Sequence, residues 1–232
     1  MLTIGFATIA EAPRDDVIPT MREMLPDVRI VERGNLNGLS HAEIAALAPQ
    51  PGEVGIVARL KSGGETLLSH KKILPRMQQL VDELVEDEGA DLIVILCGAD
   101  WSAIRSPKLV VNPGKVFPSV ISALANGRKL GIIKPSAGQV NQEKERYRAL
   151  GINATVTAAS PYAGEERLDL ARRAAEEIRD AGCDLVWMTC IGMDEAMRDV
   201  VREVTGTPII LARSILARIV TELVTVNQPA LV

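Results

Sequence analysis

Residues 88–97 read EGADLIVILC, and residues 181–190 read AGCDLVWMTC. The two segments share Gly, Asp, Leu and the final Cys at identical positions, in a chain that holds only three cysteines. Each segment follows an amphipathic stretch and carries a glycine suited to a left-handed helix C-cap, a pattern typical of a helix leading into a buried strand. The repeat indicates a chain built from two similar halves.

Short apolar runs alternate with longer amphipathic runs along the whole chain, which is the rhythm of βαβ units. The apolar runs are LTIGFA, DLIVIL, KLGII, ATVTA, DLVWM and TPIIL. Strands that are apolar throughout are typical of parallel sheets covered by helices on both faces. We therefore expect an α/β fold of two similar parallel-sheet domains, related by a pseudo-twofold axis, with a cleft between them.

The two similar halves are not equally long. Gly5 and Cys97 are farther apart than Gly131 and Cys190, so the first half carries extra residues, which we expect at about 34–70. Alternation on both sides of the Gly63-Gly64 turn predicts a β-hairpin within this insert, beside the parallel sheet.

Composition limits the partners. The chain has 232 residues, of which 47% are hydrophobic and 3% aromatic, and its net charge is −4. Without a basic stripe or stacking aromatics, nucleic acid is not an expected partner, and no apolar run is long enough for a membrane helix. We expect a cytoplasmic protein that binds a small molecule, and a homo-oligomer remains open.

Metal and disulfide chemistry is not expected either. Three cysteines without CxxC spacing favour neither a disulfide framework nor a zinc site. The only histidines, His41 and His70, have no partner at metal-ligand spacing and are expected to be surface or hydrogen-bonding residues. We expect no metal and no cofactor.

Cys97 and Cys190 are the candidate catalytic residues. Each follows its apolar run, at the carboxyl end of a predicted parallel strand, where ligands bind in open α/β sheets. If the two halves face one another, the two thiols flank one bound molecule. One thiolate can then remove a proton from a carbon while the opposite thiol protonates its other face, as in a racemase or isomerase.

The alternative for both cysteines is ordinary packing, since free cysteine is among the most buried residue types. Cys183 aligns with Ala90 in the other copy and is assigned to structure. Two further functions stay open beside the two-thiol isomerase. One is a lyase, decarboxylase or amide-ring hydrolase that uses Cys190 alone, and the other is a binding protein without activity.

Other polar or small residues at predicted strand ends are candidates for substrate binding. Arg14 either grips a substrate carboxylate or is a surface arginine beside Asp15 and Asp16. Asp100 is either a polar contact or a helix cap. The full set of expected substrate-binding residues is Thr8, Arg14, Gly98, Asp100, Ser160, Tyr162, Gly192 and Arg213.

Several motifs together resemble the AroM family, a branch of the aspartate/glutamate/hydantoin racemase superfamily. They are TIAEAPRDDVIPTM, ILPRMQQLVDELVEDEGADLIVILCG, AASPY, DLVWMTCIGM and PIILARSILARIVTEL. The resemblance spans nearly the whole chain. It implies two similar α/β domains with the active site between them, a C-terminal segment that returns to the first domain, and one acid/base cysteine from each side. With that return, we expect a first domain over residues 1–106 and 208–232 and a second domain over residues 107–207.

The residues after the cysteines depart from the familiar racemases of that superfamily. Those enzymes follow the first cysteine with Asn-Thr and the second with Thr-His, whereas here Gly98 follows Cys97 and Ile191 follows Cys190. The usual amino-acid clamp is absent, so aspartate and glutamate are not expected substrates. The resemblance implies a small carboxylated substrate, and the superfamily also includes maleate isomerases and arylmalonate decarboxylases.

Overall fold

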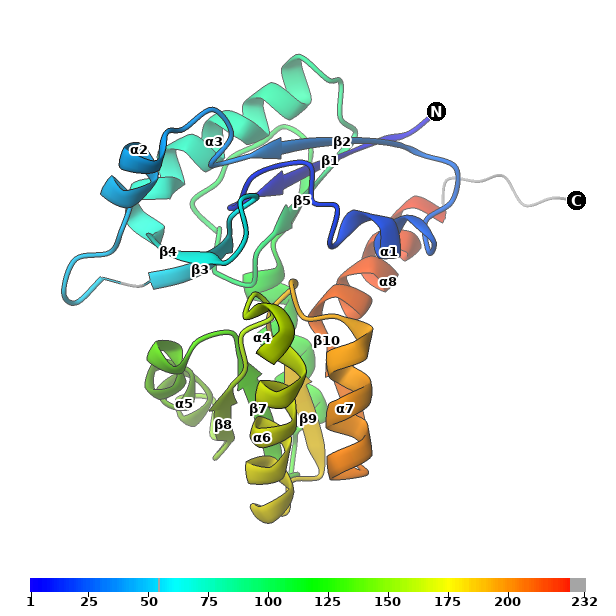
Figure 1. Ribbon diagram of the computed structural model, residues 1–232. Helices are drawn as coiled ribbons and strands as arrows, with labels where there is room; N and C mark the ends of the chain where they lie inside the picture. The colour runs from blue at the N-terminus through cyan, green and yellow to red at the C-terminus, as the bar shows by residue number, and fades with distance from the viewer. Residues whose placement is uncertain (54, 226–232) are drawn as a thin grey trace, which may run out of the picture. The chain divides into compact units, whose positions relative to one another are not determined.

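The computed structural model describes residues 1–53 and 55–225, which fall into two compact units. Unit 1 comprises Met1–Lys115 together with the C-terminal segment from Leu216, and unit 2 comprises Val116–Ile215. Each unit is an α/β body built on one parallel four-stranded sheet (Figure 1). The predicted fold class, α/β with two similar parallel-sheet units, is confirmed in these respects.

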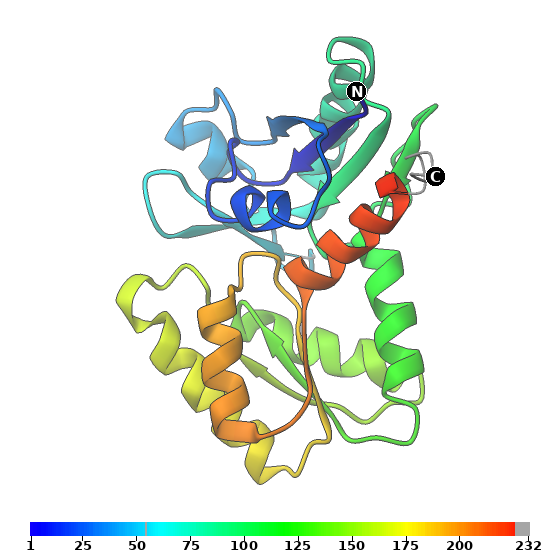
Figure 2. The ribbon, with the colours of Figure 1, turned by 90° about the vertical axis from the view of Figure 1, so that its right-hand side faces the viewer.

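The sheet of unit 1 has the strand order β2-β1-β5-β6. Its strands are β1 (Thr3–Thr8), β2 (Arg29–Gly34), β5 (Leu92–Leu96) and β6 (Leu109–Val111). Every residue of β1 and β5 is buried, because helices cover both faces of the sheet. These helices are α3 (His70–Glu86) on one face and α1 (Ile18–Arg22) and α8 (Ala212–Thr225) on the other (Figure 2).

The sheet of unit 2 has the corresponding order β8-β7-β9-β10. Its strands are β7 (Leu130–Lys134), β8 (Thr155–Ala158), β9 (Leu185–Met188) and β10 (Ile209–Leu211). Helices α4 (Pro113–Leu124) and α5 (Val140–Arg148) cover one face, and α6 (Arg167–Asp180) and α7 (Glu195–Thr205) cover the other (Figure 2). Two short 3₁₀ turns, Ala137–Gln139 and Gly164–Glu166, precede α5 and α6.

The chain passes between the units within α4 and within α8. These crossings come later than the boundaries expected at 106/107 and 207/208. The reason is strand pairing: β6 pairs with β5 and so extends unit 1, whereas β10 pairs with β9 and so extends unit 2. Sequence analysis did not identify β6, which has only three residues, or β2, whose RIVERG sequence mixes charged and apolar side chains.

Both sheets also share their register. Ile4 pairs with Leu92 in unit 1, and the matching residues Leu130 and Leu185 pair in unit 2. Gly5 and Gly131 occupy the same place in their strands, and both allow a helix to pack closely. A Cβ on Gly131 would lie 2.7 Å from the side chain of Ile178 in α6, a distance too short for any larger residue.

The insert of unit 1 lies between β2 and α3 and contains the predicted hairpin. Strands β3 (Gly55–Arg59) and β4 (Glu65–Ser69) pair antiparallel, after the short helix α2 (His41–Ala46). Gly63 and Gly64 form the turn with φ of 102° and 77°. The hairpin is a separate two-stranded sheet and is tied to the loop after β1, where the Lys61 amide donates to Glu11 at 2.6 Å.

Within the described residues, no helix combines the length and the apolar character that crossing a membrane requires.

Candidate functional site

Cys97 and Cys190 occupy equivalent places at the carboxyl edges of the two sheets. Cys97 directly follows β5, whose last residue Leu96 pairs with Thr8 at the end of β1. Cys190 follows β9 after Thr189, whose amide donates to the carbonyl of Ile133 in β7 at 3.1 Å. The repeated sequence therefore ends on two thiols at the sheet edge where parallel α/β folds bind ligands.

Cys97 lies in a tight turn. Its side chain is buried, with 6% of the residue exposed, and the Ala99 amide donates to its Sγ at 3.5 Å. Gly98, the expected binding residue between them, is half-buried. The turn packs on Gly114 so closely that no side chain fits at that glycine, because a Cβ would collide with the carbonyl of Ala99. A thiolate accepts a hydrogen bond from an amide more strongly than a thiol does.

Thr8 ends β1 with its hydroxyl fully buried and oriented by two donors. The Ala10 amide donates to its Oγ1 at 3.3 Å, and Nη1 of Arg14 donates at 3.1 Å. Because a hydroxyl has two acceptor lone pairs and one proton, Thr8 acts toward any further partner as a donor. Its position beside the end of β5 suits recognition of an acceptor oxygen.

Arg14 is 3% exposed, so it is not a surface arginine, although it does pair with a neighbouring acid as that alternative expected. Its Nε and Nη2 donate to the two carboxylate oxygens of Asp16 at 2.7 and 2.8 Å. The fork that sequence analysis assigned to a substrate carboxylate is thus paired within the chain. The contacts of Arg14 position Thr8 and the loop after β1.

Sequence analysis placed Arg14 beside Asp15 and Asp16 but did not anticipate that Arg59 joins them. Arg59, on strand β3 of the hairpin, donates from Nη1 to Asp15 at 2.5 Å and to Asp16 at 3.1 Å. Burial alone would raise the pKa of Asp16, but the hydrogen bond and charge of Arg14, with the charge of Arg59, hold that pKa below its ordinary value. The hairpin is therefore fixed by charge to the loop that carries Arg14.

Glu32 of β2 also belongs to this network and accepts the Arg14 amide at 2.7 Å. Burial raises the pKa of Glu32 above its ordinary value, although the Arg14 amide and charge oppose that effect. The sequence did hold a signal for this network. Asp15 and Asp16 directly follow Arg14, and Arg59 is the only charged residue in the apolar strand β3.

Asp100 closes the turn after Cys97 rather than capping a helix. Its Oδ1 accepts the amide and hydroxyl of Ser102 and the side-chain amide of Asn112, and its Oδ2 pairs with Lys115 at 3.0 Å. Desolvation alone would raise the pKa of Asp100, but these donors hold that pKa far below its usual range. The arrangement favours a structural role for this carboxylate.

Unit 2 brings three of the expected residues together beside Cys190. The Tyr162 amide donates to Oγ of Ser160 at 3.1 Å, which sets the turn after β8. The phenol of Tyr162 packs directly against Gly192, and a Cβ at that position would overlap the hydroxyl oxygen. Ser160, Tyr162, Cys190 and Gly192 are all partly exposed at this edge.

Arg213 braces the Cys190 loop from within unit 2. It is 3% exposed, and its Nε and Nη2 donate to the carbonyls of Ile191 and Gly192 at 3.1 and 2.9 Å. Its Nη1 lies 3.7 Å from Glu195. Sequence analysis expected Arg213 to bind substrate, and its bonds to the loop carbonyls favour a role in positioning Cys190.

Cys183 lies away from this edge, at the entry of β9, and burial raises the pKa of its thiol. This is the environment of an inert packing cysteine.

Lys134 is a residue at the carboxyl edge that sequence analysis missed. The alignment that matches Gly5 with Gly131 also matches Thr8 with Lys134, so the repeat itself carried the signal. Its ammonium is 3.4 Å from Glu143 of α5.

The described residues hold no group of three or more His, Cys, Asp or Glu side chains able to bind a metal ion. His70, which is partly buried, packs against Trp101 of the unit 1 core, with ring centroids 4.6 Å apart and ring planes at 53°.

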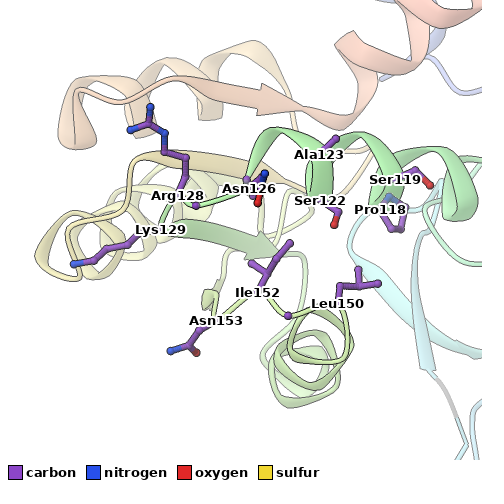
Figure 3. A pocket seen from close by; sticks show the side chains of 13 residues that line it. Pro118, Ser119, Ser122, Ala123, Asn126, Arg128, Lys129, Leu150, Ile152 and Asn153 are labelled. Atoms are coloured by element: carbon purple, nitrogen blue, oxygen red, sulfur yellow. The ribbon is translucent and has the colours of Figure 1, made fainter.

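A groove of about 1020 Å³ lies at the other edge of the unit 2 sheet, where β7 and β8 begin (Figure 3). The end of α4 forms one side with Ser119 and Ser122, and Leu150 and Ile152 line the other. In Figure 3 the side chains of Arg128 and Lys129 extend away from Leu150. None of the expected site residues lines this groove.

Solved structures similar to this chain include three enzymes. Glutamate racemase from Thermus thermophilus, in complex with β-chloro-D-alanine, has a TM-score of 0.62 at 16% identity, covering 97% of this chain and 81% of that one. Aspartate racemase from Picrophilus torridus has a TM-score of 0.57 at 15% identity, covering 96% and 94%. Unliganded arylmalonate decarboxylase has a TM-score of 0.53 at 14% identity, covering 99% and 94%.

At these identities the likeness establishes a racemase-type fold and leaves the reaction open. No curated protein matches the chain. The family described as AroM protein matches residues 4–224, nearly the whole sequence. The chain therefore belongs to the AroM family.

Proposed function

We propose that this protein is a cofactor-independent isomerase or racemase of a small carboxylated molecule, with Cys97 and Cys190 as its acid and base. The observation that carries the proposal is the equivalence of the two cysteines. They follow matching strands in two sheets that share strand order and register. A thiol that merely fills a core has no reason to recur at the ligand-binding edge of both sheets.

The reaction needs one proton removed and one added. The thiolate of one cysteine takes the proton next to the substrate carboxylate, leaving a carbanion delocalised into that carboxylate. The thiol of the other cysteine protonates the opposite face of the carbanion. After this step the first cysteine is a thiol and the second is a thiolate, so the next turnover runs in the reverse direction. The Thr8 hydroxyl and the amides of the cysteine turns are donors suited to the developing negative oxygen.

Deuterium incorporation tests this proposal. Amino acids, hydantoins, malonates and maleate are incubated with the protein in D₂O, and optical rotation and product mass are followed. A substrate that inverts should gain deuterium at its acidic carbon. Cys97→Ser and Cys190→Ser should each abolish inversion, and full inversion by the double variant would refute the proposal.

A second candidate is a decarboxylase or other lyase that uses Cys190 alone. It is favoured by the unequal exposure of the two thiols, since Cys97 is buried and Cys190 is partly exposed. The fold is compatible with it, because arylmalonate decarboxylase is among the similar structures. In this case Cys190→Ser is inactive, Cys97→Ser retains much of its turnover, and the product differs from the substrate in formula.

We propose cytoplasmic action on a free small molecule, with no nucleic acid, membrane or cofactor involved. A protein that only binds its ligand would turn over none of the four compound classes, and both serine variants would leave its ligand affinity nearly unchanged.

A further inference from the structure

Lys134 ends β7, the strand that lies between β8 and β9 in the sheet of unit 2. Its carbonyl accepts the amide of Ala159, the residue before Ser160, at 2.8 Å. The preceding residue, Ile133, accepts the amide of Thr189, the residue before Cys190. The backbone of Lys134 therefore lies between the two strand ends that lead to Ser160 and Cys190.

The Lys134 side chain is largely removed from solvent, with 15% exposed, and it faces the helix α5. Its ammonium donates to Oε2 of Glu143, whose side chain is 7% exposed. The distance of 3.4 Å is longer than the usual length of a charge-assisted hydrogen bond, about 2.7–2.9 Å. Glu143 is in turn shared with Arg146, 3.8 Å away.

The pairing of Lys134 leaves capacity for an additional anion. Among the described residues its ammonium bonds Glu143, at a long distance. An ammonium has three donors, and a cation withdrawn from water is stable only when it is paired and hydrogen-bonded. Glu143 uses one of these donors at long range.

The other cations near this edge are already used within the chain. Arg213 is bonded to two loop carbonyls, and Arg167 pairs with Asp194 at 3.0 Å, where Asp194 caps α7. In unit 1 the fork of Arg14 is paired with Asp16. Among these charged side chains, Lys134 has the weakest internal pairing.

We propose that Lys134 is a substrate-binding residue that receives the substrate's carboxylate at the carboxyl edge of unit 2. The inference rests on the proposed function for the nature of the ligand. It assigns the role that sequence analysis gave to Arg14 to a residue in the other unit. Its counterpart by the repeat, Thr8, offers a neutral donor, so the two edges differ in charge.

The test compares two alkylating reagents that differ in charge, and it needs neither substrate nor turnover. Iodoacetate is an anion and iodoacetamide is neutral, and both alkylate a thiolate at carbon with loss of iodide. Their rates at Cys190 are measured by mass spectrometry at low ionic strength, where charges act over tens of ångströms. The readout is the ratio of the iodoacetate rate to the iodoacetamide rate, which cancels changes in thiol reactivity.

Lys134→Met should lower this ratio at Cys190 by about twofold or more, the size expected for one charge acting through a partly solvated edge. Lys134→Arg should retain the ratio. Lys144→Met, which removes an exposed lysine next to Glu143, should lower it less, because water screens an exposed charge more strongly. The difference between wild type and Lys134→Met should disappear in 1 M salt.

An unchanged ratio in folded Lys134→Met would overturn the inference. If that variant does not fold because buried Glu143 loses Lys134, the single variant Glu143→Gln is compared with the double variant that carries both Lys134→Met and Glu143→Gln. Equal ratios in these two proteins overturn the inference as well. The result of this alkylation test can be told apart from the result of the isomerase test. A lowered ratio in a protein without turnover supports an anion site in a binding protein, and an unchanged ratio in an active isomerase removes Lys134 alone.

Discussion

Tyr162 packs against Gly192 so closely that the glycine cannot be replaced without moving the phenol. The contact joins the turn after β8 to the loop that carries Cys190, two segments that each continue from the carboxyl edge of the same sheet. Gly192 is also held from the other side, because Arg213 donates to its carbonyl. The ring of Tyr162 and the guanidinium of Arg213 therefore set the shape of the Cys190 loop.

Gly192→Ala should displace Tyr162 and distort the Cys190 loop. We expect the free energy of unfolding to fall by about 1–3 kcal/mol, the usual cost of adding a methyl group to a packed site. The rate of Cys190 alkylation by iodoacetamide should change as well, as measured by mass spectrometry. Gly138→Ala is the control, since a Cβ there meets only Oγ of Ser136 at 3.7 Å. Equal effects of the two substitutions would contradict this account of the loop.

Arg213→Met should also loosen the Cys190 loop, by leaving two loop carbonyls without their charged donor. A hydrogen bond to a charged group contributes about 1.5–3 kcal/mol, so the loss of two such bonds should lower the free energy of unfolding in urea by about 3–6 kcal/mol. Arg198→Met is the matched control on α7, because Arg198 pairs with Asp199 at an exposed site where ion pairs contribute little. A loss no greater than that of the control would show that Arg213 does not support the loop.

Asp16→Asn should destabilise unit 1 in a pH-dependent manner. At neutral pH the variant leaves the buried Arg14 with a neutral partner, and we expect a loss of about 1–3 kcal/mol. The pKa of Asp16 in the folded protein lies below the ordinary value of 3.8. The unfolded chain therefore binds the proton first, and the contribution of the carboxylate is present above pH 3.8 and lost as the pH falls through the folded pKa.

The measurement is urea unfolding of both proteins at pH 7 and at several values below 4. The gap between wild type and Asp16→Asn should narrow with acidity. A gap that stays constant or widens would mean that the Arg14–Asp16 pair does not stabilise the fold.

The repeated segments were sufficient to predict the fold because each shared residue has a physical cause. Gly89 and Gly182 both take φ of 65° after their helices. Asp91 accepts the Thr3 amide while its own amide donates to the Thr3 carbonyl, and Asp184 makes the same exchange with Lys129. These local requirements are visible in the sequence, and they mark β5 and β9 as equivalent strands of the two sheets.

The candidate site was less predictable, because long-range pairing decides the role of a charged side chain. The cysteine positions followed from strand ends alone. The role of Arg14 depended on Asp16 and on Arg59, which comes from a hairpin strand more than forty positions away. The role of Arg213 depended on the carbonyls of a loop that precedes it by about twenty residues. No periodicity encodes such contacts.

Cys97 and Cys190 should be alkylated faster than Cys183 in the folded protein near neutral pH. The thiolate is the reactive species, and burial raises the pKa of Cys183, so its thiolate fraction rises only at higher pH than that of an ordinary cysteine. Brief iodoacetamide treatment followed by mass spectrometry gives the extent of labelling at each residue. Repeating the treatment in urea should bring the three rates together, since the differences arise from the fold. The pH series adds a second criterion, because the rate at Cys183 should keep rising above pH 9, beyond its ordinary value. Preferential labelling of Cys183 in the folded state would contradict the assignment of the two strand-end thiols to the site.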